Sequence, residues 1–398
     1  MIRILFVDDE EAVLEGLRDA LRRFRDEWEM RFALGGRAAL AELEAGAFDV
    51  VVSDMRMPDV DGAAVLAEAR ERQPAAVRIV LSGQTELEQE LRALPVAHQF
   101  LTKPCDTEEL HGVVARACSV RELLDRTEIR SIVGAASALP SPPAAYAELT
   151  AALSSPDASV ADVVAIVERD VAMSAKVIQL VNSAFFGLGR RTADAREAIA
   201  YLGVETVRAA TLLGGVMLEF RPARPVAGFS LDALERHSLR VVGHATQVVR
   251  RADVEHVLMG AMLHDVGKLL LASHRPDELA ASIAEAGRRG CPPHVVELEL
   301  LGTTHAEIGA SLLAFWGLPD PVVETVAHHH RPERSPRGAP GPAVVHVVDA
   351  LVTRGERPDA PWAPALLDRG GLAAAGWAER ALEWEAAVAE RLREEAAA

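Results

Sequence analysis

The sequence predicts two folds in series, a doubly wound parallel α/β sheet over roughly residues 1–120 and an all-α bundle after it. In the first part, apolar runs alternate with helical patterns, and each run stops abruptly at polar residues. Continuous apolar strands separated by helices are typical of a parallel sheet that is covered on both faces. From Ala144 to about Arg354 no alternating strand pattern occurs, and frequent Ala, Leu, Glu and Arg favour helices.

Four apolar runs account for the predicted strands, at residues 2–7, 50–52, 77–81 and 98–102. Because ligands bind beyond the carboxyl ends of parallel strands, the residues that follow each run are the candidates for chemistry. These residues are Asp8, Asp9, Asp54, Ser82 and Lys103. Any one of them could be a turn former or a helix cap, but five at the ends of four strands indicate a single site.

The candidate residues have the chemistry of phosphoryl transfer. Three crowded carboxylates repel one another unless a cation is bound, and hard oxygen ligands in a hydrated site suit Mg²⁺. One carboxylate can then act as a nucleophile toward a phosphoryl donor and form an aspartyl phosphate. The Ser82 hydroxyl and the Lys103 ammonium would stabilise the phosphoryl oxygens.

The strand-end residues lie in four segments, FVDDE (6–10), VSDMRMPDVDG (52–62), LSG (81–83) and LTKP (101–104). With these segments, residues 1–120 resemble a receiver domain of two-component signalling, which implies a flavodoxin-like sheet of five strands. The resemblance implies that Asp54 accepts a phosphoryl group from a sensor histidine kinase. It also implies that Mg²⁺ is held by Asp8, Asp9, Asp54 and the main-chain carbonyl of Arg56.

The same resemblance implies a switch. Phe100 falls on the aromatic switch position of receiver domains, three residues before Lys103. Phosphorylation of Asp54 would draw Ser82 toward the phosphoryl oxygens and let Phe100 move inward.

A helical linker is predicted at residues 121–138. An apolar stripe at steps of three and four runs from Leu110 to Leu124, past the end of the sheet domain. The stripe could form a short coiled coil in a homodimer, or, as we favour, pack between the domains. The prolines of the segment LPSPP (139–143) then interrupt the helical pattern, and the next domain begins there.

Histidines recur on the apolar faces of the predicted helices in the second domain. A lone inward histidine is more often a hydrogen-bonded core residue than a metal ligand. Here several could converge with Asp265 and Asp349. Mixed His/Asp ligation suits Zn²⁺, Mn²⁺ or Fe, where a bound water could become a hydrolytic nucleophile.

Residues 139–335 contain the segments LVNSA (180–184), AIAYLG (198–203), LHDVGK (263–268), THAEIG (304–309) and WGLP (316–319). On these motifs the region resembles the HDOD domain, a relative of the HD-type metal-dependent phosphohydrolases. The helix around His237 is also similar to the first metal-binding helix of HD-GYP phosphodiesterases. That similarity implies a second metal site, formed by His237, His264, Asp265, His305, His328, His329 and Asp349.

The similarity to phosphodiesterases is incomplete, because RPER (331–334) stands where a Gly-Tyr-Pro triplet would follow the histidines. HDOD domains are regarded mainly as regulatory modules. We therefore expect a response regulator whose HDOD output domain binds a protein partner that the sequence does not identify. The alternative is a receiver-gated, metal-dependent phosphodiesterase, so enzymatic activity stays open. Residues 336–398 are predicted to form a loop and a C-terminal helix.

Composition excludes other classes. Lys+Arg 42 against Asp+Glu 59 gives a net charge of −17, and aromatic residues make up 4%, which argue against binding DNA or stacking bases. Apolar stretches fall short of the 18 or so residues that a membrane span needs, and the N-terminus lacks the shape of a signal peptide. Three distant cysteines suit a reducing compartment. We expect a cytoplasmic protein without membrane insertion.

Overall fold

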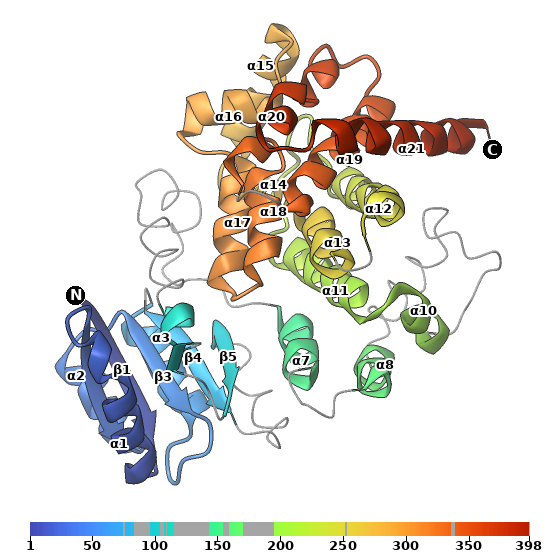
Figure 1. Ribbon diagram of the computed structural model, residues 1–398. Helices are drawn as coiled ribbons and strands as arrows, with labels where there is room; N and C mark the ends of the chain where they lie inside the picture. Colours follow the sequence, from blue (N-terminus) through green and yellow to red (C-terminus); the bar gives the residue numbers. More distant parts are fainter. Residues whose placement is uncertain are drawn as a thin grey trace. The chain divides into compact units, whose positions relative to one another are not determined.

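The computed structural model describes residues 1–74, 76–82, 96–103, 107–108, 110–114, 143–153, 159–169, 195–250, 253–335 and 339–397. It divides into two compact units (Figure 1). The predicted linker at 121–138 and the LVNSA segment lie outside the described residues.

The N-terminal unit contains a five-stranded parallel sheet in the order β2-β1-β3-β4-β5. Its strands are β1 (Ile2–Asp8), β2 (Trp28–Leu34), β3 (Val50–Asp54), β4 (Val77–Ser82) and β5 (Gln99–Thr102). This confirms the predicted doubly wound sheet. The apolar runs did not reveal β2, because this edge strand carries the charged residues Glu29 and Arg31.

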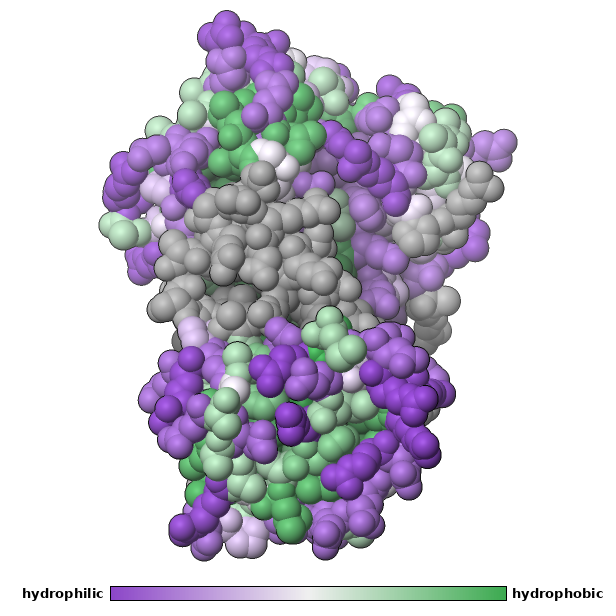
Figure 2. Space-filling model, turned by 90° about the vertical axis from the view of Figure 1, so that its left-hand side faces the viewer, coloured by the Kyte–Doolittle hydropathy of each residue, from purple (hydrophilic) through white to green (hydrophobic). Residues whose placement is uncertain are grey.

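Helices cover the sheet because each buries one apolar face. They include α1 (Glu11–Ala20), the 3-10 turn η1 (Leu21–Phe24), α2 (Gly36–Ala45) and α3 (Gly62–Arg72). Residues of α2 and α3 join Leu5, Val51 and Val80 from the strands in one core. Figure 2 shows hydrophobic residues bordered by hydrophilic ones on the visible face of this unit. Two further helices, α7 (Ala144–Leu153) and α8 (Val160–Arg169), follow along the chain.

The C-terminal unit is helical, and its described residues include no strand, which confirms the predicted all-α bundle. The helices are α10 (Ala195–Leu202), α11 (Val204–Glu219), α12 (Leu231–Val248), α13 (Val254–Leu263), α14 (Val266–His274), α15 (Pro276–Arg289), α16 (Pro293–Leu301), α17 (His305–Phe315), α18 (Asp320–His328), α19 (Pro340–Glu356), α20 (Arg369–Ala374) and α21 (Ala378–Ala397). Two 3-10 turns, η2 (Pro332–Arg334) and η3 (Ala363–Leu366), complete the unit. Helices α12, α13, α18 and α19 pack together at its centre.

The helical unit continues beyond residue 335, where we had placed the end of the HDOD domain. Helix α19 packs against α12, α13 and α18, and its buried face includes Asp349. Helix α21 packs on α19 and α12, with Trp384 and Val388 buried. The predicted loop is also shorter than expected, because α19 begins at Pro340. The C-terminal helix therefore covers the bundle.

The length and apolarity of the helices bear on membrane insertion. Within the described ranges, no single helix is long and apolar enough to cross a membrane. One bent pair, Arg196–Leu202 with Thr206–Met217, reaches both limits only when its two helices are counted together.

A glycine contact sets the separation of α14 and α17. A Cβ atom at Gly267 would lie 1.9 Å from the carbonyl oxygen of His305, far inside contact distance. Gly309 faces it from α17, where a Cβ would lie 3.0 Å from the Gly267 nitrogen. The close approach brings the residues after α13 next to the first turn of α17.

Replacing Gly267 by alanine should therefore destabilise the helical unit. Because the added methyl meets backbone, we expect Gly267→Ala to lower the free energy of unfolding by roughly 1–3 kcal/mol in urea titrations. The matched control is Gly214→Ala in α11, where an added Cβ would meet no atom of another described segment within 4 Å. This change should stabilise the helix by about 0.5–1 kcal/mol. Equal losses in the two variants would contradict the close contact.

Candidate functional sites

The first candidate site lies at the carboxyl edge of the sheet. Strands β1 and β3 end at Asp8 and Asp54, which are 2% and 6% exposed. The Lys103 ammonium, just after β5, lies 2.7 Å from Asp8 Oδ2 and also forms an ion pair with Asp54. The structure thus brings together three of the residues that the strand ends indicated, while Asp9 is exposed.

The electrostatics of this site favour an additional cation. Burial raises the pKa of Asp54, the contact with Lys103 opposes this rise, and the charge of Asp8 adds to it. Burial alone would lower the pKa of Lys103, but its hydrogen bonds to Asp54 and Asp8 outweigh this and raise it. One ammonium therefore compensates two buried carboxylates. The oxygen donors fit Mg²⁺, whose charge would complete that compensation.

The loop after β3 keeps Arg56, whose main-chain carbonyl is a predicted Mg²⁺ ligand, near Asp54. The Gly62 N–H donates to the Met55 carbonyl at 3.0 Å, and a Cβ on Gly62 would lie 2.1 Å from the Asp54 carbonyl oxygen. Only glycine fits this close approach. A backbone hydrogen bond from Arg56 reaches the Asp54 carboxylate, which keeps Arg56 beside the site.

Two predicted residues are placed only by their backbone. Ser82 ends β4 and pairs with Thr102 of β5, so it lies at the same edge of the sheet as Asp54. Phe100 lies within β5. The side chains of Ser82 and Phe100 are outside the part of the chain that the structure describes, and their roles stay predictions.

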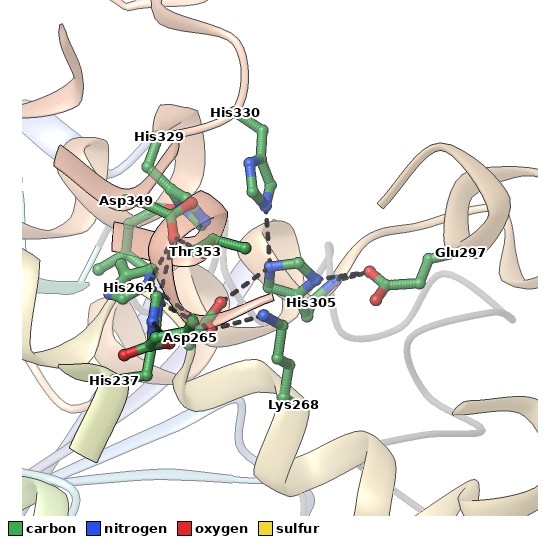
Figure 3. Close-up of polar contacts among 12 residues, drawn as sticks. His237, His264, Asp265, Lys268, Glu297, His305, His329, His330, Asp349 and Thr353 are labelled. Atoms are coloured by element: carbon green, nitrogen blue, oxygen red, sulfur yellow. Dashed lines mark hydrogen bonds and ion pairs between the residues drawn. The ribbon is translucent and has the colours of Figure 1, made fainter. Parts of the chain in front are cut away.

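The second candidate site is a cluster of histidines and aspartates inside the helical unit (Figure 3). Three overlapping groups each bring their ligand atoms within 4.8 Å of one another. The groups are His237, His264 and Asp349, then His264, Asp265 and His329, and finally His305, His329 and His330. They come from α12, α17, α19, the junction of α13 and α14, and the turn after α18. We call these seven residues the histidine cluster.

Short contacts link the members of the histidine cluster. His237 Nε2 lies 3.0 Å from Asp349 Oδ1 and 3.2 Å from His264 Nε2. His305 Nε2 lies 3.2 Å from Asp265 Oδ1 and 3.1 Å from His330 Nε2. The Nε2 atoms therefore face one another and the carboxylates, as ligands around a common centre would.

The opposite ring nitrogens are anchored. His264 Nδ1 donates to the Ala261 carbonyl at 2.7 Å, and His329 Nδ1 donates to the Val326 carbonyl at 2.8 Å. In each neutral ring, Nε2 therefore carries a free lone pair that can bind a metal. Carboxylates accept hydrogen bonds from the Nδ1 atoms of the two other rings. Glu356 Oε2 lies 2.9 Å from His237 Nδ1, and Glu297 Oε2 lies 2.7 Å from His305 Nδ1.

Sequence reasoning missed both of these glutamates. Glu297 is fully buried in α16, and also accepts a hydrogen bond from the His305 backbone N–H. For Glu297, the sequence signal is a glutamate within an apolar helical stretch. For Glu356 there is no such signal, because a glutamate at the end of a helix is typical of a solvent-exposed residue.

The charge state of the cluster without metal follows from these contacts. Burial alone would lower the pKa of His237, but Asp349 and Glu356 outweigh it and raise the pKa to about 9. Burial likewise opposes charge on His305, yet Glu297 and Asp265 raise its pKa to about 9.

The aspartates respond in the opposite direction. Burial would raise the pKa of Asp265 and of Asp349, but nearby cationic groups outweigh it and lower both: Lys268 for Asp265, and His237 for Asp349. Protons on histidines therefore balance buried carboxylates in this structure. A metal cation could replace those protons.

The residues of the cluster fit a transition metal. His329 Nε2 is buried and has no hydrogen-bond partner in the described residues, although it lies in a group with His264 and Asp265. A buried lone pair without a donor is unfavourable, and a metal ion would satisfy it. The mixture of imidazole and carboxylate donors suits Fe, Mn or Zn.

One predicted ligand does not join the cluster. His328 belongs to none of the groups, and lines a separate small pocket with Glu307 and Arg334. His330, which was not among the expected ligands, takes part instead. The reason is that α18 ends at His328, and the following turn rather than the helix positions His329 and His330.

The cluster faces a cavity of about 450 Å³. Five of its members line this cavity: His237, Asp265, His305, His330 and Asp349. Lys268 also lines it, with its ammonium 2.5 Å from Asp265 Oδ2. The volume is within the usual range for small-molecule sites, about 300–1,000 Å³. A ligand in the cavity would therefore meet the metal-binding groups directly.

Comparison with known proteins agrees with both units. The family model of the response regulator receiver domain matches residues 4–115, and that of the HDOD domain matches residues 139–332. The chain joins a receiver domain to an HDOD domain. Both resemblances stated from the sequence are thereby confirmed, and this domain composition is that of a response regulator.

Individual relatives match parts of the chain. An uncharacterized protein of Treponema pallidum is 28% identical over 160 residues, which is 40% of this chain and 31% of that protein. Regulatory protein AtoC of Escherichia coli is 35% identical over 131 residues, 33% of this chain and 28% of AtoC. The chain thus spans about a third or less of these relatives.

A solved HDOD domain protein of unknown function from Geobacter sulfurreducens has a similar fold. It gives a TM-score of 0.51 at 24% identity and covers 70% of this chain and 94% of its own. At this identity the likeness concerns the fold alone.

Metal binding to the histidine cluster should stabilise the protein. With Mn²⁺ at 100 times its Kd, the free energy of unfolding should rise by about 2.7 kcal/mol over the metal-depleted protein, measured by urea titration. His264→Gln should abolish the increase, whereas His328→Gln should retain it because His328 lies outside the cluster. Equal responses of the two variants would contradict the assignment.

Proposed function

We propose that this response regulator accepts a phosphoryl group on Asp54 from a sensor histidine kinase, and that its HDOD domain is a metal-dependent phosphohydrolase. The observation that carries the second part is the buried histidine cluster open to a cavity. It favours the alternative over the protein-binding module that we expected from the sequence. Both reactions would take place in the cytoplasm, where we expect the kinase partner.

Phosphorylation would begin with attack of an Asp54 carboxylate oxygen on phosphorus. The new O–P bond forms as the P–N bond to the donor histidine breaks, and the imidazole keeps the electron pair and takes a proton. Lys103 lies against Asp54 and would neutralise charge on the transferred group. Asp8 and Asp54 would hold Mg²⁺ with Asp9 and the Arg56 carbonyl.

In the HDOD domain, a bound metal would supply a Lewis acid and a more acidic water. The chain's own groups would hold it through the Nε2 atoms of the histidines and the carboxylates of Asp265 and Asp349. Lys268 lines the cavity beside Asp265 and would contact a phosphoryl oxygen. In hydrolysis, the water oxygen bonds to phosphorus as the ester P–O bond breaks, and the leaving alcohol gains a proton.

A role in binding a protein partner alone would leave the buried charge unexplained. Asp265, Glu297 and Asp349 are 3%, 0% and 5% exposed. Desolvated carboxylates destabilise a fold unless cations compensate them. A domain that only bound a protein partner would be at least as stable with apolar residues at these buried positions. We propose that phosphorylation controls this site through the predicted linker helix, as an interdomain contact or a dimer.

Phosphorylation is tested with acetyl phosphate and Mg²⁺. We expect the intact protein to gain the mass of one phosphoryl group, and Asp54→Asn to remove this gain because the nucleophile is lost. Asp59→Asn is the matched control, since Asp59 is an exposed aspartate of the same loop. Labelling that persists in Asp54→Asn would refute the assignment.

Hydrolysis is tested with bis(p-nitrophenyl) phosphate and the Mn²⁺- or Fe-loaded protein. Asp265→Asn should lower kcat/KM by more than roughly 100-fold, because it removes a metal-binding carboxylate. His328→Gln should leave kcat/KM unchanged. If the metal-loaded protein releases no p-nitrophenol, the domain is not a phosphohydrolase of this substrate class and the binding module is the better conclusion.

A further inference from the structure

Two of the cationic side chains that line the cavity have no ion-pair partner among the described residues. Four ionic contacts account for most of the charged groups there: Lys268 with Asp265, Arg240 with Glu356, His237 with Asp349 and His305 with Glu297. Two further cationic residues, Arg236 and Arg357, also line the cavity.

Both of these arginines are exposed, and neither makes an ion pair with any residue that the structure describes. The Arg357 guanidinium lies 6.0 Å from the ring centre of Trp362. Two guanidinium groups therefore line the cavity without a carboxylate partner among the described residues, whereas Arg240 and Lys268 are paired. In a chain with a net charge of −17, two unpaired guanidinium groups beside one cavity mark a site for anions.

The cavity also has an apolar wall. It is formed by Phe229 before α12, by Leu279 and Ile283 of α15, and by Trp362 and Leu366 around η3. Neither α15 nor η3 carries a member of the histidine cluster. A small anion such as inorganic phosphate would leave this wall unused, so the cavity suits a ligand with an apolar or aromatic part.

Gly228 fixes one part of this wall. Its φ angle is +78°, and a Cβ there would lie 2.7 Å from Cγ2 of Ile283. The loop before α12 is thus packed directly on α15, which places the two apolar segments side by side at the cavity.

We infer that the substrate of the HDOD centre is a phosphoester that carries a second anionic group and an apolar or aromatic group, and that Arg236 and Arg357 bind the second anion. The inference rests on the proposed hydrolase activity and names its substrate class. The phosphoryl group to be hydrolysed would lie at the histidine cluster beside Lys268. The second anion would lie against the two guanidinium groups, and the apolar part against the wall.

A matched pair of substrates tests this assignment. Thymidine 5′-(p-nitrophenyl phosphate) and its 3′-phosphorylated analogue share one leaving group, but the 3′-phosphate adds nearly two negative charges near pH 7. With the metal-loaded full chain, we expect kcat/KM to be about tenfold higher for the 3′-phosphorylated substrate. The difference should lie mainly in KM and shrink at high salt.

Substitutions assign the preference to the two arginines. The double variant Arg236→Gln, Arg357→Gln should lose the tenfold preference by a rise in KM for the 3′-phosphorylated substrate. Arg236→Lys, Arg357→Lys should keep most of it, because the charge is retained. The control Arg288→Gln removes an exposed arginine that does not line the cavity, and should keep all of it.

The outcomes separate the two proposals. Hydrolysis of both substrates with equal kcat/KM overturns the inference and leaves the hydrolase standing. If neither substrate is hydrolysed, the hydrolase proposal fails, and calorimetry with thymidine 3′,5′-bisphosphate and thymidine 5′-monophosphate decides the inference alone. Tighter binding of the bisphosphate that the double Gln variant loses supports it, and equal binding overturns it.

Discussion

The burial of like charges is the constraint on which the helical unit depends. Asp265, Asp349 and Glu297 are removed from water, and each carboxylate would destabilise the fold if it lacked a cationic partner. The unit provides that partner each time, as a histidine or as Lys268. Because these partners come from separate helices, the packing of α12, α13, α18 and α19 is also what keeps the charges compensated.

The receiver site also contains buried carboxylates that need a cationic partner, but it lies at the edge of a sheet rather than inside a helical bundle. In the sheet, the topology alone brings strand ends together, so Asp8 and Asp54 meet without any long-range packing of helices. Lys103 compensates both carboxylates, and its own side chain is 29% exposed at the sheet edge. The histidine cluster instead lies inside a bundle, where its groups come from several helices and five of them line a cavity.

This difference explains how much the sequence could predict. The receiver residues follow from strand ends that are visible as apolar runs, and only the charged edge strand β2 was missed. In the bundle, helical periodicity placed His237 and His305 on inward faces, but it did not single out the inward residues of the triplet 328–330. That choice depends on the turn after α18, whose backbone no longer follows the helical period. Glu297 and Glu356 depend on tertiary contacts that periodicity does not encode.

The C-terminal helix, which follows the HDOD region, contributes contacts that support the histidine cluster. Glu395 near the end of α21 lies 3.4 Å from a guanidinium nitrogen of Arg240, and Arg240 in turn lies 3.0 Å from Glu356. Glu356 then meets His237 Nδ1, so four residues connect the last helix to a predicted metal ligand. Each link holds the next side chain in one orientation, which is what a ring nitrogen needs in order to face a metal. The segment after residue 335 is therefore part of the site's support, although no motif of the HDOD domain lies in it.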